Sequence, residues 1–379
     1  MLLHFQDAAK LKTKKVVYEE TFYARDSGTL EQLKELSSRR RAVEESVNGS
    51  SFITAAIARE MAGGTTSRIQ QDLQKLELYL PLLENLVMSV ESVGDKYQIL
   101  QWTTNLKIQW TSALNSSPAF SLGGPKFFRI DNLRFELGMA LFVYGALLRE
   151  RGLEMLCSDF VESATLFRKA AGVYEYLSQD VLPPLEPKLP PERPPEATPS
   201  MASIMRLVCL AEAQAVTVRK AEEKTTSISL LAKLHYGVAQ FVEEASNLLR
   251  SSVADWNDIS DRFRRFLSGC FVLHEARSQR YIASDLKAEE HLGLALGVLR
   301  CAKSNFQGRL PGEDSWRQIF RQEIDALDQM LRKCEHENEF IWHDKLPSLD
   351  ELPLLEGKKI VAPIAYRPFG LDREFLFIM

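Results

Sequence analysis

The sequence lacks the cysteine pattern of a disulfide-stabilised protein. Its five cysteines are odd in number, far apart and free of CxxC pairs: Cys157, Cys209, Cys270, Cys301 and Cys334. Scattered cysteines of this kind are typical of free thiols in a reducing compartment. We therefore expect no disulfide framework, and 45% apolar residues are enough to build a core without one.

The sequence also lacks a membrane-spanning run and an excess of basic residues. The longest dense apolar run, GMALFVYGALL at 138–148, has eleven residues, whereas a helix needs about 20 to cross a bilayer. The N-terminal stretch MLLHFQDAAKLKTKK does not have the basic-then-apolar order of a signal peptide. A net charge of −4 argues against general nucleic-acid binding. We expect a cytosolic chain without a nucleic-acid partner.

Motifs of catalysis and of phosphate binding are missing. The chain contains no GxxxxGK[ST], GxGxxG or GxSxG pattern, and its six histidines show no evident nucleophile partner. We therefore predict a protein that is not an enzyme and needs no cofactor.

Helical periodicity dominates what is present. From about residue 29 onward, apolar residues recur at spacings of three and four in 133–148, 160–177, 231–249 and 316–334. In the first of these stretches they are Leu133, Leu137, Leu141, Tyr144 and Leu148. Only KKVVYEETFYA (14–24) and KKIVAPIAY (358–366) are candidates for strands. The sequence predicts a mainly α fold with minor β structure near the N-terminus.

Several helical stretches pair into hairpins. Residues 133–152 and 159–177 carry small side chains where two helices must approach closely, at Ala140, Gly145 and Ala164. Residues 276–302 repeat the pattern, although the match to a regular 34-residue tetratricopeptide array is degenerate. Stacked hairpins of this kind predict an elongated α-solenoid.

Residues 182–199, LPPLEPKLPPERPPEATP, interrupt the helices. They hold eight of the sixteen prolines, and proline is excluded from helix interiors. We predict an exposed, polyproline-like loop between two long helices. A PxxP ligand for an SH3-like domain is the alternative function of this loop.

The stretch RKCEHENEFIWHDKLPSLDELP at 332–353 brings Cys334, His336 and His343 together among carboxylates, as a metal site can. Cys334, however, completes the apolar stripe that begins at Trp316, and His336 does not share its helix face. A structural zinc site also needs four ligands. We therefore predict no metal site here.

Three basic clusters remain to be placed: Lys12, Lys14 and Lys15; residues 39–41; and Arg262, Arg264 and Arg265. Solvated helix faces are one interpretation. A weak contact with anionic membrane, where each basic residue contributes roughly 1 kcal/mol, is the other. Phe263 and Phe266 within the last cluster are expected in the core.

Five stretches resemble, in chain order, the BRO (Bro-one) domain family. They are FRIDNLRFELGMALFVYGALLRERG, ESATLFRKAAGVYEYL, CLAEAQAVTVRKA, LLAKLHYGVAQFVEEA and NEFIWHDKLPSLDELP. The resemblance spans nearly the whole chain and is greatest to the plant single-domain, endosomal-targeting BRO-like proteins. It implies one BRO-like domain over 1–379, boomerang-shaped around a tetratricopeptide-like core, with a closing segment, 337–379, that packs back on the helices.

The resemblance also implies a function in binding. Family members take the C-terminal amphipathic helix of an ESCRT-III filament subunit in a concave apolar groove, and act in multivesicular-body sorting at late endosomes. Leu230 and Leu234 match two apolar groove positions, and Thr217 stands where the family carries an aromatic. Leu234 also belongs to the stripe that we expect in the core, so a purely structural role is the alternative for these leucines.

The same resemblance assigns Phe340, Ile341 and Trp342 as the anchor by which the tail packs on the helices. It makes the chain an adaptor of ESCRT-dependent sorting, with other ESCRT components as further partners. A regulatory competitor, which occupies a partner's site without recruiting anything further, is the alternative function.

Overall fold

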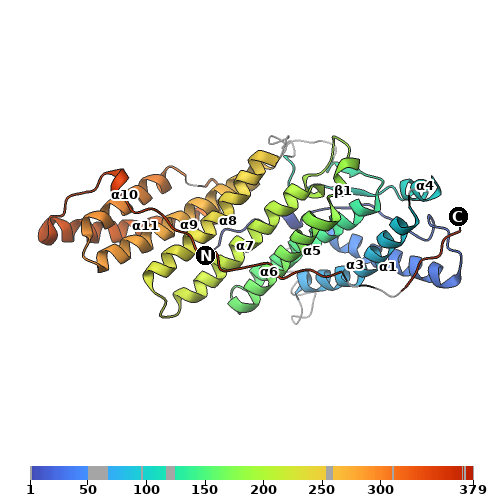
Figure 1. Cartoon of the computed structure of the whole chain (residues 1–379), viewed down its shortest axis with the longest axis horizontal. Helices are drawn as coiled ribbons and strands as arrows, with labels where there is room; N and C mark the ends of the chain where they lie inside the picture. The colour runs from blue at the N-terminus through green and yellow to red at the C-terminus, as the bar shows by residue number, and fades with distance from the viewer. Residues whose placement is uncertain are drawn as a thin grey trace.

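The computed structural model describes residues 2–49, 67–94, 97–116, 124–252, 259–309, 311–368, 370 and 373–378. Antiparallel helices stack side by side into an elongated body, and, apart from the short α4, helices that follow one another in the chain are neighbours in space (Figure 1). They are α1 (Ser27–Gly49), α3 (Arg68–Val93), α4 (Tyr97–Asn105), α5 (Leu133–Met155), α6 (Phe160–Tyr176), α7 (Pro199–Glu222), α8 (Ile228–Ser252), α9 (Asp261–Ala288), α10 (Leu292–Gln307) and α11 (Asp314–Glu337). The predicted fold class, mainly helical and elongated, is confirmed.

The minor β structure lies elsewhere than the two candidate stretches. Strand β1 (Gln109–Thr111) pairs antiparallel with β2 (Phe127–Arg129), with Trp110 opposite Phe128. The stretch 14–24 contributes only an isolated bridge, Ala24 to Phe377, at its end. Its apolar residues instead cover the helices, and Tyr18 and Phe22 are buried. The stretch 358–366 is extended and forms no strand.

The apolar stripes predicted from the sequence lie on α5, α6, α8 and α11 and face the core. Leu133, Leu137 and Leu141 of α5 are buried, as are Phe263 and Phe266 of α9. Asn132 caps the start of α5, where its Oδ1 accepts a hydrogen bond from the Arg134 backbone N–H.

Helix α5 packs between α3 and α6 and therefore carries buried charges that need partners. Glu136 is fully buried, and its carboxylate accepts hydrogen bonds from Arg40 Nε (2.5 Å), Tyr79 Oη (2.9 Å) and Trp110 Nε1 (2.7 Å). Removing one partner of such a buried pair typically costs about 3–5 kcal/mol. Arg40 belongs to the basic run 39–41, so the structure places the middle arginine of that run in the core.

The proline-rich segment 182–199 is only partly the exposed loop that the sequence predicts. Pro184 and Pro191 are exposed, but Leu182, Leu185 and Glu196 are buried. The Glu196 carboxylate explains why this segment is held down. It accepts hydrogen bonds from the Ser112 hydroxyl (2.9 Å) and from the backbone N–H groups of Ala113 (2.7 Å) and Leu114 (2.9 Å), beside β1.

Helix α7 is long and apolar enough to cross a membrane by length and composition alone. Its most apolar window is 83% buried inside the fold, however. This helix packs against both α6 and α8. Its composition is therefore that of a central core helix.

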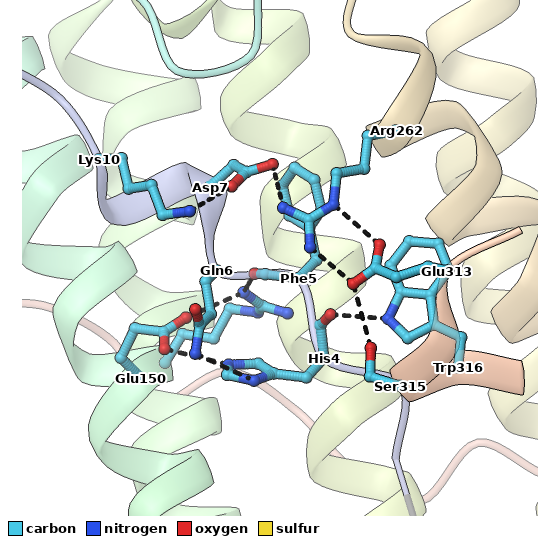
Figure 2. Close-up of polar contacts among 11 residues, drawn as sticks. His4, Phe5, Gln6, Asp7, Lys10, Glu150, Arg262, Glu313, Ser315 and Trp316 are labelled. Carbon is cyan, nitrogen blue, oxygen red and sulfur yellow. Dashed lines mark hydrogen bonds and ion pairs between the residues drawn. The ribbon is translucent and has the colours of Figure 1, made fainter. Parts of the chain in front are cut away.

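The N-terminal segment crosses the middle of the stack and joins distant helices (Figures 1 and 2). The His4 imidazole lies 3.1 Å from the Glu150 carboxylate of α5, and the His4 carbonyl accepts a hydrogen bond from Trp316 Nε1 of α11 at 2.9 Å. Three residues on, Asp7 accepts a hydrogen bond from Arg262 of α9 at 2.5 Å. The segment thus ties α5 to α9 and α11.

The C-terminal tail after α11 returns along most of the body. Figure 1 shows it as a dark red trace that passes α7 and α6 and ends near α1. Along the way, backbone groups of Lys358, Ile364 and Leu376 form hydrogen bonds with α8, α6 and α1 respectively. Along 358–364 the tail is an extended strap held mainly through its backbone.

Candidate partner-binding site

The groove residues inferred from the sequence lie where α7 meets α8. The two helices run antiparallel and pack along their length. Gln214 of α7 contacts the backbone of Leu234, so Thr217, about one turn further along α7, lies level with Leu230. The structure thus brings Leu230, Leu234 and Thr217 to one region of the α7–α8 seam.

The three residues differ in accessibility. Leu234 is only 4% exposed and belongs to the main core cluster, whereas Leu230 packs against that cluster and is half-buried. The Thr217 hydroxyl donates to the Ala213 carbonyl of its own helix at 2.8 Å. A partner can therefore reach Leu230 at the edge of the seam, while Leu234 is part of the packing beneath it.

The tail closes the seam beside Leu234, through the buried amide of Gln214. Its Nε2 donates to the carbonyls of Leu234 (2.8 Å) and Lys358 (2.9 Å), and its Oε1 accepts from the Ile360 N–H (2.9 Å). Both amide protons and the oxygen are therefore satisfied. Gly237 permits this approach, because a Cβ there would lie only 2.4 Å from the Lys358 oxygen.

The tail anchor inferred from the sequence is wrong. Phe340 is 65% exposed, Ile341 67% and Trp342 42%. They lie on a π-helical turn, Asn338–Trp342, that ends α11. Beyond a contact between the rings of Phe340 and His336, whose centroids are 4.6 Å apart, these side chains face solvent. Three adjacent apolar residues cannot all face inward from one short turn.

Polar side chains hold this turn instead. Asn338 Nδ2 donates to the Asp344 carbonyl (3.1 Å), and Asn338 Oδ1 accepts from the Asp344 N–H (2.8 Å). The Asp344 carboxylate in turn accepts from the N–H of Gly293, at the start of α10 (3.0 Å). His343 between them takes a left-handed backbone conformation with φ of 57°. Sequence reasoning missed this pair because polar anchors follow no apolar period.

Aromatic side chains anchor the far end of the tail. Tyr366 donates to Glu84 of α3 at 3.0 Å and packs against Tyr144 and Tyr176. Burial and the neighbouring Glu84 carboxylate raise the pKa of Tyr366. Phe377 is 7% exposed and belongs, like Phe375, to the main core cluster.

A polar chain with a buried histidine pair joins α7, α8 and α9 next to the seam. Tyr281 Oη donates to Glu222 (2.8 Å), Glu222 lies 3.1 Å from His235 Nε2, and His235 Nδ1 lies 3.2 Å from His274 Nδ1. Because Glu222 accepts, His235 donates from Nε2 and must accept at Nδ1 from His274. Burial lowers the pKa of both histidines. Burial alone raises the pKa of Glu222, but hydrogen bonds led by that from His235 outweigh it and lower this pKa to about 2.

The region around Cys334 has the character of a core position. Cys334 is fully buried, and burial raises the pKa of its thiol. His336 packs on Phe340, while His343 lies beyond the end of the helix. Within the described part of the chain, no three His, Cys, Asp or Glu side chains gather as metal ligands would.

The antiparallel stack and the strap along it define an elongated helical scaffold of the kind that binds through its surfaces. The family described as BRO1-like domain matches residues 41–374, which include all six partner-binding and tail residues inferred from the sequence. The chain therefore belongs to the BRO1-like domain family. The resemblance inferred from its motifs is confirmed.

Known proteins of this family are similar over most of the chain. The human BRO1 domain-containing protein BROX is 26% identical over 306 residues, which cover 76% of this chain and 71% of BROX. Programmed cell death 6-interacting protein from Xenopus laevis is 22% identical over 76% of this chain and 32% of that protein.

Solved structures show the same fold. A complex of the ALIX BRO1 domain with CHMP4C matches with a TM-score of 0.69 and 19% identity, over 96% of both chains. ALIX bound to the SIVmac239 PYKEVTEDL late domain matches with a TM-score of 0.71 and 19% identity. The match covers 97% of this chain and 49%, about half, of that ALIX chain.

Proposed function

We propose that this chain is a non-enzymatic adaptor of ESCRT-dependent endosomal sorting, which binds the C-terminal amphipathic helix of an ESCRT-III subunit. The observation that carries the proposal is membership of the BRO1-like family, together with the match over 96% of the chain to an ALIX BRO1 domain in complex with CHMP4C. In this proposal the chain is cytosolic and is recruited to late endosomes by its partner.

The site that we propose is the edge of the α7–α8 seam at Leu230. An amphipathic helix binds such a surface through apolar side chains at i, i+3 or i+4, and i+7. Leu230 is half-buried and already supported by the core, so an incoming apolar side chain completes its burial at little entropic cost. Leu234 supports it from beneath rather than touching the partner.

Calorimetric titration with a peptide of the ESCRT-III C-terminal helix tests the proposal. Leu230→Asp puts an unpaired carboxylate into the apolar contact, and we expect it to weaken binding by about 2 kcal/mol or more. Leu78→Asp is the matched control, because Leu78 lies on α3, is 52% exposed and undergoes the same change. Full affinity in a folded Leu230→Asp variant, or no binding by the unmodified chain, would contradict the proposal.

A further inference from the structure

The basic cluster at the start of α9 divides between two environments. Arg262 turns to the N-terminal segment and pairs with Asp7 (2.5 Å) and Glu313 (2.7 Å) (Figure 2). Arg264 and Arg265 instead line a cavity of about 560 Å³ between the last turns of α8 and the first turns of α9. That volume is within the range of small-molecule sites, roughly 300–1,000 Å³.

Two further arginines reach the same cavity from other parts of the chain. Arg250 comes from the end of α8, and Arg309 follows the end of α10. Arg250 donates to the Asn247 side chain at 2.7 Å, and neither arginine pairs with a carboxylate among the residues that the structure describes. Four guanidinium groups from three separate segments therefore line one concave site.

Carboxylates balance only part of this charge. Asp261 and Glu243 line the cavity too, and Asp261 pairs with Arg265 at 2.8 Å and with Arg264 at 3.4 Å. The lining therefore keeps a surplus of two positive charges. A third carboxylate, Glu275, interacts electrostatically with Arg309 and offsets part of this surplus. Concave walls concentrate the remaining positive potential inside the site.

The rest of the lining suits a compact, hydroxyl-bearing ligand. Ser246 and Ser268 supply hydroxyl groups, and an apolar part is formed by Leu249, Leu267 and Phe271. Guanidinium groups bind phosphate oxygens in bidentate fashion. A single phosphate group offers only three acceptor oxygens, too few for bidentate contacts with four guanidinium groups, so more than one phosphate is needed to engage all four arginines.

We propose that the cavity between α8 and α9 is a binding site for a polyphosphorylated ring of the inositol phosphate class. The site lies apart from the α7–α8 seam and is independent of the partner helix that binds there. The same chemistry occurs in free inositol polyphosphates and in phosphoinositide headgroups, which the test separates.

Calorimetric titration of the full chain with inositol hexakisphosphate tests the site. The double variant Arg250→Gln/Arg309→Gln removes two arginines that contribute no ion pair to the fold, and we expect its affinity to fall at least about tenfold. The matched control is Arg41→Gln/Arg129→Gln, which loses the same charge at surface positions on α1 and β2 and should bind nearly as the unmodified chain does. Flotation with phosphatidylcholine vesicles, with and without phosphatidylinositol bisphosphate, identifies the source of the headgroup.

The outcomes separate clearly. Loss of binding in the double variant but not in the control supports the site, and binding to the doped vesicles as well assigns it to a lipid headgroup. No binding of inositol hexakisphosphate by the unmodified chain overturns the proposal, as does equal loss in both double variants. Binding of the ESCRT-III peptide is expected to be unchanged in the Arg250→Gln/Arg309→Gln variant, so failure here leaves the proposed function intact.

Discussion

The two halves of α8 carry the same apolar period but meet different surroundings. In the first half, Leu234 is buried, Gln214 of α7 bridges its carbonyl to the tail, and His274 of α9 lies beside His235. In the second half, Glu243 and Arg250 line an open cavity between α8 and α9. The comparison teaches that a helical stripe locates the core side of a helix. Whether a ligand can reach the other sides of the helix depends on which other segments of the chain cover them.

The largest expected effect falls on the covered half. Leu234→Asp buries an unpaired carboxylate in the core cluster at the α7–α8 seam, and we expect it to lower the free energy of unfolding by at least about 3 kcal/mol. Urea denaturation followed by circular dichroism measures this. The Leu230→Asp variant, at the edge of the same seam, should lose less than half as much. Equal losses in the two variants would show that Leu234 is not more deeply buried in the seam than Leu230.

The histidine pair makes the covered half sensitive to pH. Burial depresses the pKa of His235 and His274 in the folded state, so the unfolded chain binds more protons just below its histidine pKa of about 6.5. Their contribution to stability is therefore complete above that pH and is lost as the pH falls towards the folded values. Each histidine contributes a slope of at most about 1.4 kcal/mol per pH unit.

Denaturation between pH 7.5 and pH 5 measures this slope. His274→Asn keeps a donor for His235 Nδ1 but removes one titrating group, so we expect a shallower loss of stability on acidification. Glu222, Tyr281, Arg277 and Glu323 face the pair and remain in the variant. An unchanged slope would place the sensitivity elsewhere.

Removing the amide that holds the tail should open the covered half locally. Gln214→Ala leaves the Leu234 and Lys358 carbonyls and the Ile360 N–H without this partner, and we expect a loss of about 2 kcal/mol. Amide hydrogen exchange should rise at 358–364. The matched control Asn85→Ala breaks a single amide-to-carbonyl bond, to Arg373, and should raise exchange only at the far end of the tail. If exchange rises along the whole tail in both variants, these two contacts do not each hold their own part of the tail.

The smallest effect on stability is expected in the open half. Arg250→Gln removes an exposed side chain that donates a hydrogen bond to Asn247, and we expect a change within about 0.5 kcal/mol. Thermal or urea unfolding measures it. A loss of more than 1 kcal/mol would show that this arginine belongs to the packing rather than to a ligand site.

The sequence predicted the features that depend on local period. The stripes of α5, α6, α8 and α11 were predicted because an apolar face needs only residues within the same helix. The resemblance assigns Leu230 and Leu234 to one groove, and that role stays a prediction. It could not show that Lys358 and Ile360, more than a hundred residues later, lie across Gln214 and close the α7–α8 seam.

The features that sequence reasoning missed depend on residues far apart in the chain. The resemblance assigns Phe340, Ile341 and Trp342 as anchors, whereas the turn is held by Asn338 and Asp344. The sequence does not indicate where the basic side chains point, because the groups around them are far away in the chain. Arg40 has its partner on α5, and Arg309 joins the α8–α9 cavity from beyond α10. No local pattern encodes either contact.

Hydrogen exchange of the chain with and without saturating ESCRT-III peptide tests the central claim most directly, because it locates the partner on one half of α8. We expect added protection at the end of α7 and the start of α8, around Thr217 and Leu230, and none at residues 243–268. Protection confined to 243–268, or absent while the peptide is bound, would contradict the assignment of the α7–α8 edge as the binding surface.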